Sequence, residues 1–348
     1  MNLRKKAMKP AWGVLALAAF MSFAPTPVHG QQNSTLIRVG YFPNLTHAQA
    51  LVGRANGQFE QALGPGVHLD WKAFNAGPSA IEALFAKALD MAYVGPNPAV
   101  TGYIRSEGVA LRVIAGAASG GAALVVRQGA GIHQVSDFHG KRVATPQLGN
   151  TQDVALRAWL RASNLLPRDK GGDVQVLPTS NPDQLTLFLK GQLDAAWAPE
   201  PWAARLVHEG GGRIFLDERD LWPNREFVAA EIIVSTAFLK NHPDLVKKFL
   251  RTHVELTEWI NKNPKQAKQI LNQQIQKETG KPLPPEELND AFSRMEVTYD
   301  PIRSALLKSS QQAFEQGFLG RTPPDLSGLF DLTLLNEILQ EKKARQVQ

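Results

Sequence analysis

The strongest constraint in this sequence is a pattern of strand and helix signals that starts again after 104 residues, from Arg38 to Arg142. With this shift Arg38-Val39-Gly40 lies over Arg142-Val143-Ala144, and Leu89-Asp90 lies over Leu193-Asp194. One offset carries two consecutive strand–loop–helix units without a gap. Chance agreement of apolar positions is common between such units, but a shared offset favours a duplicated architecture.

Each unit has the signals of an α/β structure. Leu36 to Tyr41 and Val67 to Phe74 are typical of strands, and Pro78-Ser79 opens a stretch with Ile81 and Leu84 at helical spacing. Alternation of this kind predicts a mainly parallel sheet covered by helices. Two similar units in one chain predict two lobes with a cleft between them.

Two strand-like segments are candidates for crossing between the lobes, Ala122 to Arg127 and Phe227 to Ser235. With these crossings the chain is expected to divide into one discontinuous lobe, residues 31–123 and 229–348, and a second lobe, residues 124–228. The C-terminal third, which has helical signals from Asn241 onward, then returns to the first lobe.

The first thirty residues have the pattern of a secretory signal peptide. Arg4, Lys5, Lys6 and Lys9 precede an apolar run from Ala11 to Phe23, and small residues at Val28 and Gly30 suit a cleavage site. The run is shorter than the roughly 20 residues of a spanning helix, although an uncleaved anchor is the alternative. We expect residues 1–30 to be removed, leaving a periplasmic protein without stable membrane insertion.

Charge and cysteine content exclude several kinds of partner and chemistry. The chain has 38 Lys and Arg against 32 Asp and Glu, and four of the basic residues lie in residues 1–30, so the mature part has a net charge of 34 − 32 = +2. This small excess gives no reason to expect nucleic acid as a partner. The absence of Cys excludes disulfides, thiolate chemistry and a lipoprotein anchor.

Candidate ligand-binding residues follow from the rule that open parallel sheets bind ligands beyond the carboxyl ends of their strands. The segments at these positions contain Gly and Pro with neutral hydrogen-bonding side chains, and almost no Lys or Arg. The expected binding residues are Asn44, Thr46, His47, Gly77, Pro78, Ser79, Gly95, Asn97, Ser119, Gly120, Gln147, Gly149, Asn150, Thr151, Glu200 and Trp202.

Neutral donors at several helix starts suit an oxyanion, because a helix N-terminus presents free N–H groups and about half a positive charge. A sulfonate fits better than a phosphate monoester, which more often recruits Arg. The alternative for any one segment is that these residues are ordinary caps and turns.

Several residues allow two interpretations. Trp202 either stacks on a ligand or fills the core, and Glu200 either binds an ammonium group or forms an ion pair. Glu231 either ties the lobes together or faces the cleft. His47 is a possible donor to an anion, but it has no second ligand at useful spacing, so no metal site is expected. Motifs of hydrolases, phosphate loops and zinc proteases are missing, so neither catalysis nor a cofactor is expected.

The sequence resembles the periplasmic substrate-binding proteins of ABC importers for nitrate, taurine and aliphatic sulfonates. The resemblance lies in five stretches between about residues 35 and 260: Arg38 to Ala48, Phe74 to Ser79, Leu89 to Pro96, Asp137 to Ala144, and Ala196 to Pro201. Members that bind thiamine precursors use a Cys-rich motif, which this chain lacks.

The resemblance implies a type II two-lobed periplasmic binding protein with a central cleft and a hinge of two crossing strands. It implies a small anionic ligand, an aliphatic sulfonate first and nitrate, bicarbonate or another small metabolite next, and ABC permease subunits as partners. We expect a monomer. The rivals are a periplasmic enzyme, for which Glu200 and His47 are the only acid–base pair on offer, and a ligand sensor on the same scaffold.

Overall fold

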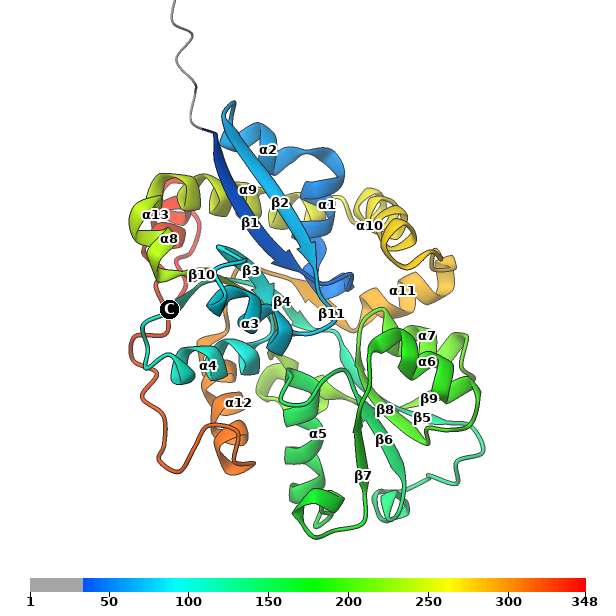
Figure 1. Ribbon diagram of the computed structural model, residues 1–348. Helices are drawn as coiled ribbons and strands as arrows, with labels where there is room; N and C mark the ends of the chain where they lie inside the picture. Colours follow the sequence, from blue (N-terminus) through cyan, green and yellow to red (C-terminus); the bar gives the residue numbers. More distant parts are fainter. Residues whose placement is uncertain (1–33) are drawn as a thin grey trace, which may run out of the picture. The chain divides into compact units, whose positions relative to one another are not determined.

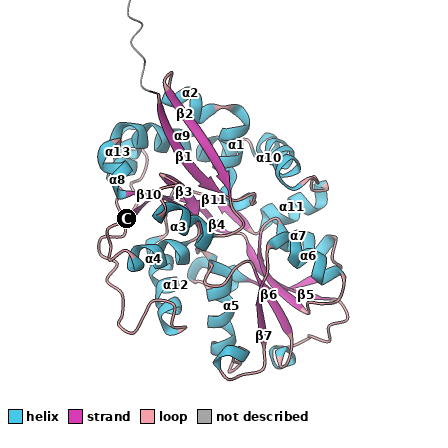
Figure 2. Cartoon of the chain, viewed as in Figure 1, coloured by secondary structure: helices cyan, strands magenta, loops and turns pink. Residues whose placement is uncertain are grey.

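Two mixed β-sheets with helices on both faces make up residues 34–348, the part of the chain that the computed structural model describes (Figures 1 and 2). The expected signal peptide, residues 1–30, lies outside the described residues. The prediction of an α/β fold built from two similar halves is confirmed.

The first sheet has six strands, of which β2, β1 and β3 run parallel to one another. Strand β10 is antiparallel to its neighbours β3 and β4, and β11 pairs with the outer edge of β4. In spatial order the strands are β11 (Met295–Val297), β4 (Leu111–Gly120), β10 (Val228–Ser235), β3 (Met91–Val94), β1 (Thr35–Tyr41) and β2 (Val67–Ala73).

The second sheet repeats this arrangement with five strands. Strands β7, β6 and β8 are parallel, and β5 is antiparallel to both β8 and β9. In spatial order the strands are β7 (Gln175–Pro178), β6 (Arg142–Thr145), β8 (Ala195–Pro199), β5 (Ala122–Arg127) and β9 (Gly212–Asp217).

The duplicated pattern in the sequence reappears as matching side-chain geometry. In the first sheet the guanidinium of Arg38 binds both carboxylate oxygens of Asp90, at 2.9 and 2.8 Å. In the second sheet Arg142 binds Asp194 with the same two distances. Each pair joins two neighbouring parallel strands, with the Asp directly before its strand, and in each the Asp N–H also donates to the carbonyl of the Arg. Two structurally equivalent units explain why one sequence offset spans both.

The helices cover both faces of each sheet, because their apolar residues recur at helical spacing and pack on the alternating side chains of the strands. One face of the first sheet carries α1 (Ala48–Asn56), α2 (Gln58–Leu63), α9 (Pro243–Lys262), α10 (Pro264–Thr279), α11 (Pro285–Ser293) and α13 (Thr333–Glu341), and α8 (Thr236–Asn241) precedes α9. The other face carries α3 (Gly77–Phe85), α4 (Pro96–Arg105) and α12 (Arg303–Glu315). The second sheet lies between α5 (Thr151–Ala162) on one face and α6 (Asn181–Leu189) with α7 (Trp202–His208) on the other.

The chain passes between the sheets next to the strands expected to cross. Strand β5 follows β4 after the single residue Gly121, and β10 follows β9 after residues 218–227. Along the sequence, the antiparallel strand β5 of the second sheet therefore follows β4 of the first sheet, and the antiparallel strand β10 of the first sheet follows β9 of the second. The division into lobes at residues 124 and 228 remains a prediction. Among the described residues no helix has the length and apolar character needed to cross a membrane.

Candidate functional site

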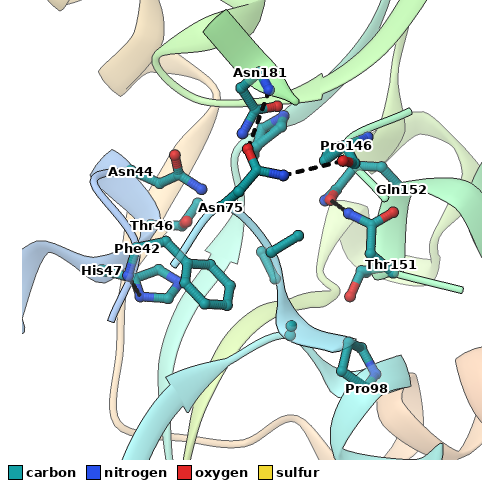
Figure 3. A pocket seen from close by; sticks show the side chains of 16 residues that line it. Phe42, Asn44, Thr46, His47, Asn75, Pro98, Pro146, Thr151, Gln152 and Asn181 are labelled. Carbon is teal, nitrogen blue, oxygen red and sulfur yellow. Dashed lines mark hydrogen bonds between the residues drawn. The ribbon is translucent and has the colours of Figure 1, made fainter. Parts of the chain in front are cut away.

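A small pocket lies where the carboxyl ends of the parallel strands of both sheets face each other (Figure 3). The cavity is small, about 20 Å³, which is space for one or two water molecules. The lining residues belong to loops and element ends that follow strands: Phe42, Asn44, Thr46, His47, Asn75, Ala76, Gly77, Gly95, Pro98, Pro146, Asn150, Thr151, Gln152, Asn181, Pro199 and Ala229.

No lining residue carries a formal charge near neutral pH. His47 is the only titratable one, and burial lowers its pKa to about 3, so the imidazole is neutral. The Phe42 N–H donates to Nδ1 of His47 at 3.1 Å, which leaves the proton on Nε2. His47 therefore offers the pocket a neutral N–H donor, and its ring lies 4.5 Å from that of Phe42, centroid to centroid, at an angle of 32°.

Four helices begin at the pocket, namely α3, α4, α5 and α6. In α3 and α4 the residue before the helix, Ala76 or Gly95, makes no side-chain cap, so these helix starts present uncapped backbone to the pocket. Helix α5 is capped by Asn150, whose side-chain oxygen accepts from the Asp153 N–H at 2.9 Å. The pocket thus collects helix N-termini, each with a partial positive charge.

Two buried oxygens at the pocket have no hydrogen-bond partner among residues 34–348. They are Oγ1 of Thr151, at the start of α5, and Oδ1 of Asn181, at the start of α6. Buried polar groups are normally hydrogen-bonded, so each unpartnered group needs an explanation. A hydroxyl can donate as well as accept, so Thr151 can serve a bound acceptor such as an oxyanion.

Seven of the residues expected from the sequence line the pocket: Asn44, Thr46, His47, Gly77, Gly95, Asn150 and Thr151. They follow strands of both sheets. Gly95, after β3 of the first sheet, lies next to Thr151, after β6 of the second. A Cβ atom built on Gly95 would lie 2.2 Å from Oγ1 of Thr151, so the two helix starts are in direct contact.

The other nine expected residues lie outside the pocket lining. Pro78 sits in the first turn of α3, and Ser79 hydrogen-bonds Gln147 across the mouth of the pocket, at 3.2 and 3.0 Å. Gly149 donates its N–H to Asp153 at 2.9 Å. Ser119 and Gly120 end strand β4, where they pair with Glu296 and Met295.

The remaining three are held by hydrogen bonds. Asn97 exchanges hydrogen bonds with Ser309 of α12, at 3.2 and 2.9 Å. Trp202 donates from its indole to Oδ1 of Asn44 at 3.1 Å, so it positions a lining residue from within the core. Glu200 is fully buried and its carboxylate accepts from Arg294 at 2.6 Å and from the Ala204 N–H at 3.1 Å.

The ion pair of Glu200 is part of a junction between the sheets. Burial raises the pKa of Glu200, and Arg294 opposes that shift. The backbone carbonyl of Glu200 accepts from the Leu45 N–H at 2.9 Å, next to the lining residues of the short helix η1 (Leu45–His47). Glu231, in the middle of β10, is also fully buried, and its oxygens have no partner among the described residues, so burial raises its pKa well above the usual range.

Nine lining residues are not among the binding residues expected from the sequence. Asn181 was detectable, since the 104-residue shift places it over Gly77, which the rule did select. Asn75 and Pro146 each stand one or two residues before a selected segment. Gln152 and Pro199 lie in the strand-end segments next to the selected Thr151 and Glu200, but they were not among the expected binding residues. Phe42, Ala76, Pro98 and Ala229 have no polar pattern that distinguishes them, and only the approach of the two sheets brings them together. No cluster of His, Asp and Glu among residues 34–348 has metal-site geometry.

The sequence pattern of the NMT1-like family matches residues 30–275. The chain belongs to this family. The taurine-binding periplasmic protein of Escherichia coli (strain K12) is 24% identical over 253 residues, which is 72% of each chain. The resemblance to ABC-importer binding proteins drawn from the sequence is confirmed.

Solved structures of two periplasmic binding proteins share the two-lobed fold. The alkanesulfonate-binding protein of Xanthomonas axonopodis pv. citri, bound to MOPS, has a TM-score of 0.69 at 20% identity, over 83% of this chain and 96% of that one. The periplasmic nitrate-binding protein of Synechocystis PCC 6803 also has a TM-score of 0.69, at 15% identity, over 88% of this chain and 89% of that one. At these identities the likeness establishes the fold.

Proposed function

We propose that this chain is the solute-binding component of an ABC import system, and that it holds a compact oxyanion, first of all an aliphatic sulfonate, between its two sheets. The observation that carries the proposal is a buried pocket without formal charge, lined by neutral donors at several helix starts. A strong-acid anion can be held in such a site by N–H groups and helix dipoles alone.

Relatives of this fold bind anions of the proposed class, namely taurine, alkanesulfonate and nitrate. Taurine fits this pocket least well, because its ammonium group would need a carboxylate and no acidic side chain lines the cavity. Nitrate is the second candidate, since the small cavity suits a compact anion.

The proposal includes export and delivery. Residues 1–30 direct the chain to the periplasm, where it works as a monomer and passes its ligand to permease subunits. It includes no catalytic step. Of the one acid–base pair considered, His47 lines the pocket, whereas Glu200 does not line it and accepts hydrogen bonds from Arg294 and the Ala204 N–H.

A thermal-shift series on the mature protein tests the ligand class. Ethanesulfonate, nitrate, sulfate, bicarbonate and a neutral sugar are compared at matched ionic strength. A true ligand at 100 times its Kd stabilises the folded state by about 2.7 kcal/mol and raises Tm by several degrees. If no anion raises Tm but the neutral compound does, the proposed ligand class is wrong.

Thr151→Val adds a test at the pocket itself. This change removes a hydroxyl that has no hydrogen-bond partner in the described part of the chain and keeps the side-chain volume. We expect roughly 10-fold weaker binding of ethanesulfonate with no loss of stability. Loss of stability with unchanged affinity would assign Thr151 a structural role instead.

A further inference from the structure

Asn75 lines the pocket from the loop between β2 and α3 and makes two hydrogen bonds to the other sheet's segments (Figure 3). Its side-chain oxygen accepts from the backbone N–H of Asn181 at 3.1 Å, and its side-chain nitrogen donates to the carbonyl of Pro146 at 3.0 Å. One amide therefore joins β2 of the first sheet to the segments that follow β7 and β6 of the second.

The bond to Asn181 replaces a missing helix cap. Asn181 is the first residue of α6, and the preceding Ser180 makes no side-chain cap; its hydroxyl instead donates to the Asp183 carboxylate. Pro182 has no N–H, so Asn181 and Asp183 hold the N–H groups of the first three helical positions. Helix α6 has no side-chain cap from its own sequence, and Asn75 supplies one from the opposite side of the cleft.

This cap can form only when the two sides of the cleft are together. In an open cleft the Asn181 N–H loses its partner within the protein and must bond water or a ligand, since a first-turn N–H has no acceptor in its own helix. Closure satisfies this donor and the Pro146 carbonyl in one step, on the rim of the cavity.

We propose that Asn75 is a latch that stabilises the closed cleft by capping α6 in trans, and that it slows ligand release without holding the ligand itself. The inference rests on the proposed binding of an anion between the sheets. It adds that α6 is used for closure, whereas α3, α4 and α5 face the ligand. Asn75 is therefore a positioning residue.

The test uses backbone chemistry to separate a latch from a ligand contact. Asn181→Pro deletes the N–H that Asn75 caps, and Pro is well tolerated at the first helical position. Ser180 already has the extended backbone that a following Pro requires, with φ −58° and ψ 149°. Asn181→Ala is the matched control, since it removes the same side chain but keeps the N–H.

Asn75→Ala is then made in both backgrounds, and ethanesulfonate release is followed by stopped-flow tryptophan fluorescence, with Trp202 as a reporter bonded to Asn44. In the Asn181→Ala background we expect release roughly 10-fold faster, the effect of losing two ordinary hydrogen bonds, with association changed less than about 2-fold. In the Asn181→Pro background the same substitution should speed release no more than about 3-fold, because only the Pro146 bond remains to be lost. Equal factors in the two backgrounds would show that Asn75 acts through the ligand and would overturn the latch.

If ethanesulfonate does not bind, the proposed function fails and its release cannot be measured. A second measurement then tests the latch without a ligand. The sequence has no Cys, so spin labels at Glu82→Cys in α3 and Thr186→Cys in α6 report the separation across the cleft without background. In the ligand-free protein we expect Asn75→Ala to shift the distance distribution toward longer separations. An unchanged distribution would overturn the latch in that case.

Discussion

At the scale of single residues, His47 shows how burial selects the form in which a side chain works. A histidine beside an anion is commonly assumed to be protonated, but here burial lowers the pKa of His47 to about 3. The Phe42 N–H fixes the tautomer by occupying Nδ1. Under the proposed function, His47 offers the anion a neutral donor whose direction is set by the backbone N–H of Phe42.

The affinity for ethanesulfonate is expected to change less than 2-fold between pH 6 and pH 8. The folded-state pKa of His47 is lowered from 6.5 to about 3, so the imidazole stays neutral throughout this window. Titration calorimetry at several pH values measures it. Tightening by 10-fold or more on going from pH 8 to pH 6 would mean that the protonated imidazole holds the anion.

At the scale of elements, the sequence predicted what depends on local pattern. The strands, the helix that opens near Pro78, and the repeat that relates Asp90 to Asp194 all follow from periodicity, proline and a fixed offset. These signals lie within a few residues of one another, or at a constant spacing along the chain.

Features that depend on the approach of distant segments were not predictable in the same way. The partner of Glu200 is Arg294, 94 positions away, and nothing in the spacing identifies it. Trp202 was equally compatible with core and ligand contact, and the structure gives it a hydrogen bond to Asn44. Ala229 has no chemical signal and enters the pocket lining only through the packing of β10.

Gly95→Ala is expected to weaken ethanesulfonate binding by roughly 10-fold or more, because the added methyl would lie 2.2 Å from Oγ1 of Thr151 and keep the starts of α4 and α5 apart. The comparison is made again in a Thr151→Ala background, where the hydroxyl is gone and the nearest atom is the Thr151 Cβ at 3.3 Å. A much smaller effect of Gly95→Ala is expected there. If Gly95→Ala lowers the affinity equally in both backgrounds, the contact with the Thr151 hydroxyl is not the cause of the loss.

Asp90→Ala and Asp194→Ala are expected to lower the free energy of unfolding by similar amounts, about 2 kcal/mol each. Each removes a carboxylate that accepts from a guanidinium and from a strand N–H. Since the pairs lie in different sheets, the double variant should show nearly the sum. Urea denaturation measures all three variants, and a large departure from additivity would contradict the independence of the pairs.

At the scale of the whole molecule, buried charge joins the two sheets next to the pocket. Arg294 follows α11 on the first sheet and binds Glu200, which follows β8 of the second, as well as Asp290 at 2.6 and 2.9 Å. Both partners of the Glu200–Arg294 pair are buried, so neither can be solvated if the other is removed.

Arg294→Met should lower the free energy of unfolding by roughly 3–5 kcal/mol, because it leaves Glu200 buried without its partner. Adding Glu200→Gln removes the stranded acid and should restore a large part of that loss. Urea denaturation of the single and double variants at pH 7 decides the matter. A double variant no more stable than Arg294→Met would show that the arginine acts by packing and not as a counter-ion.

The pocket without formal charge has a consequence for the environments in which the protein can work. Attraction between exposed ions weakens as salt is added, since the screening distance falls from about 10 Å at 0.1 M to about 3 Å at 1 M. The pocket is lined by neutral donors and contains no charged side chain whose attraction for a ligand added salt could screen. Under the proposed function, we therefore expect the affinity for the anion to depend less on ionic strength than the affinity of a site built on surface lysines.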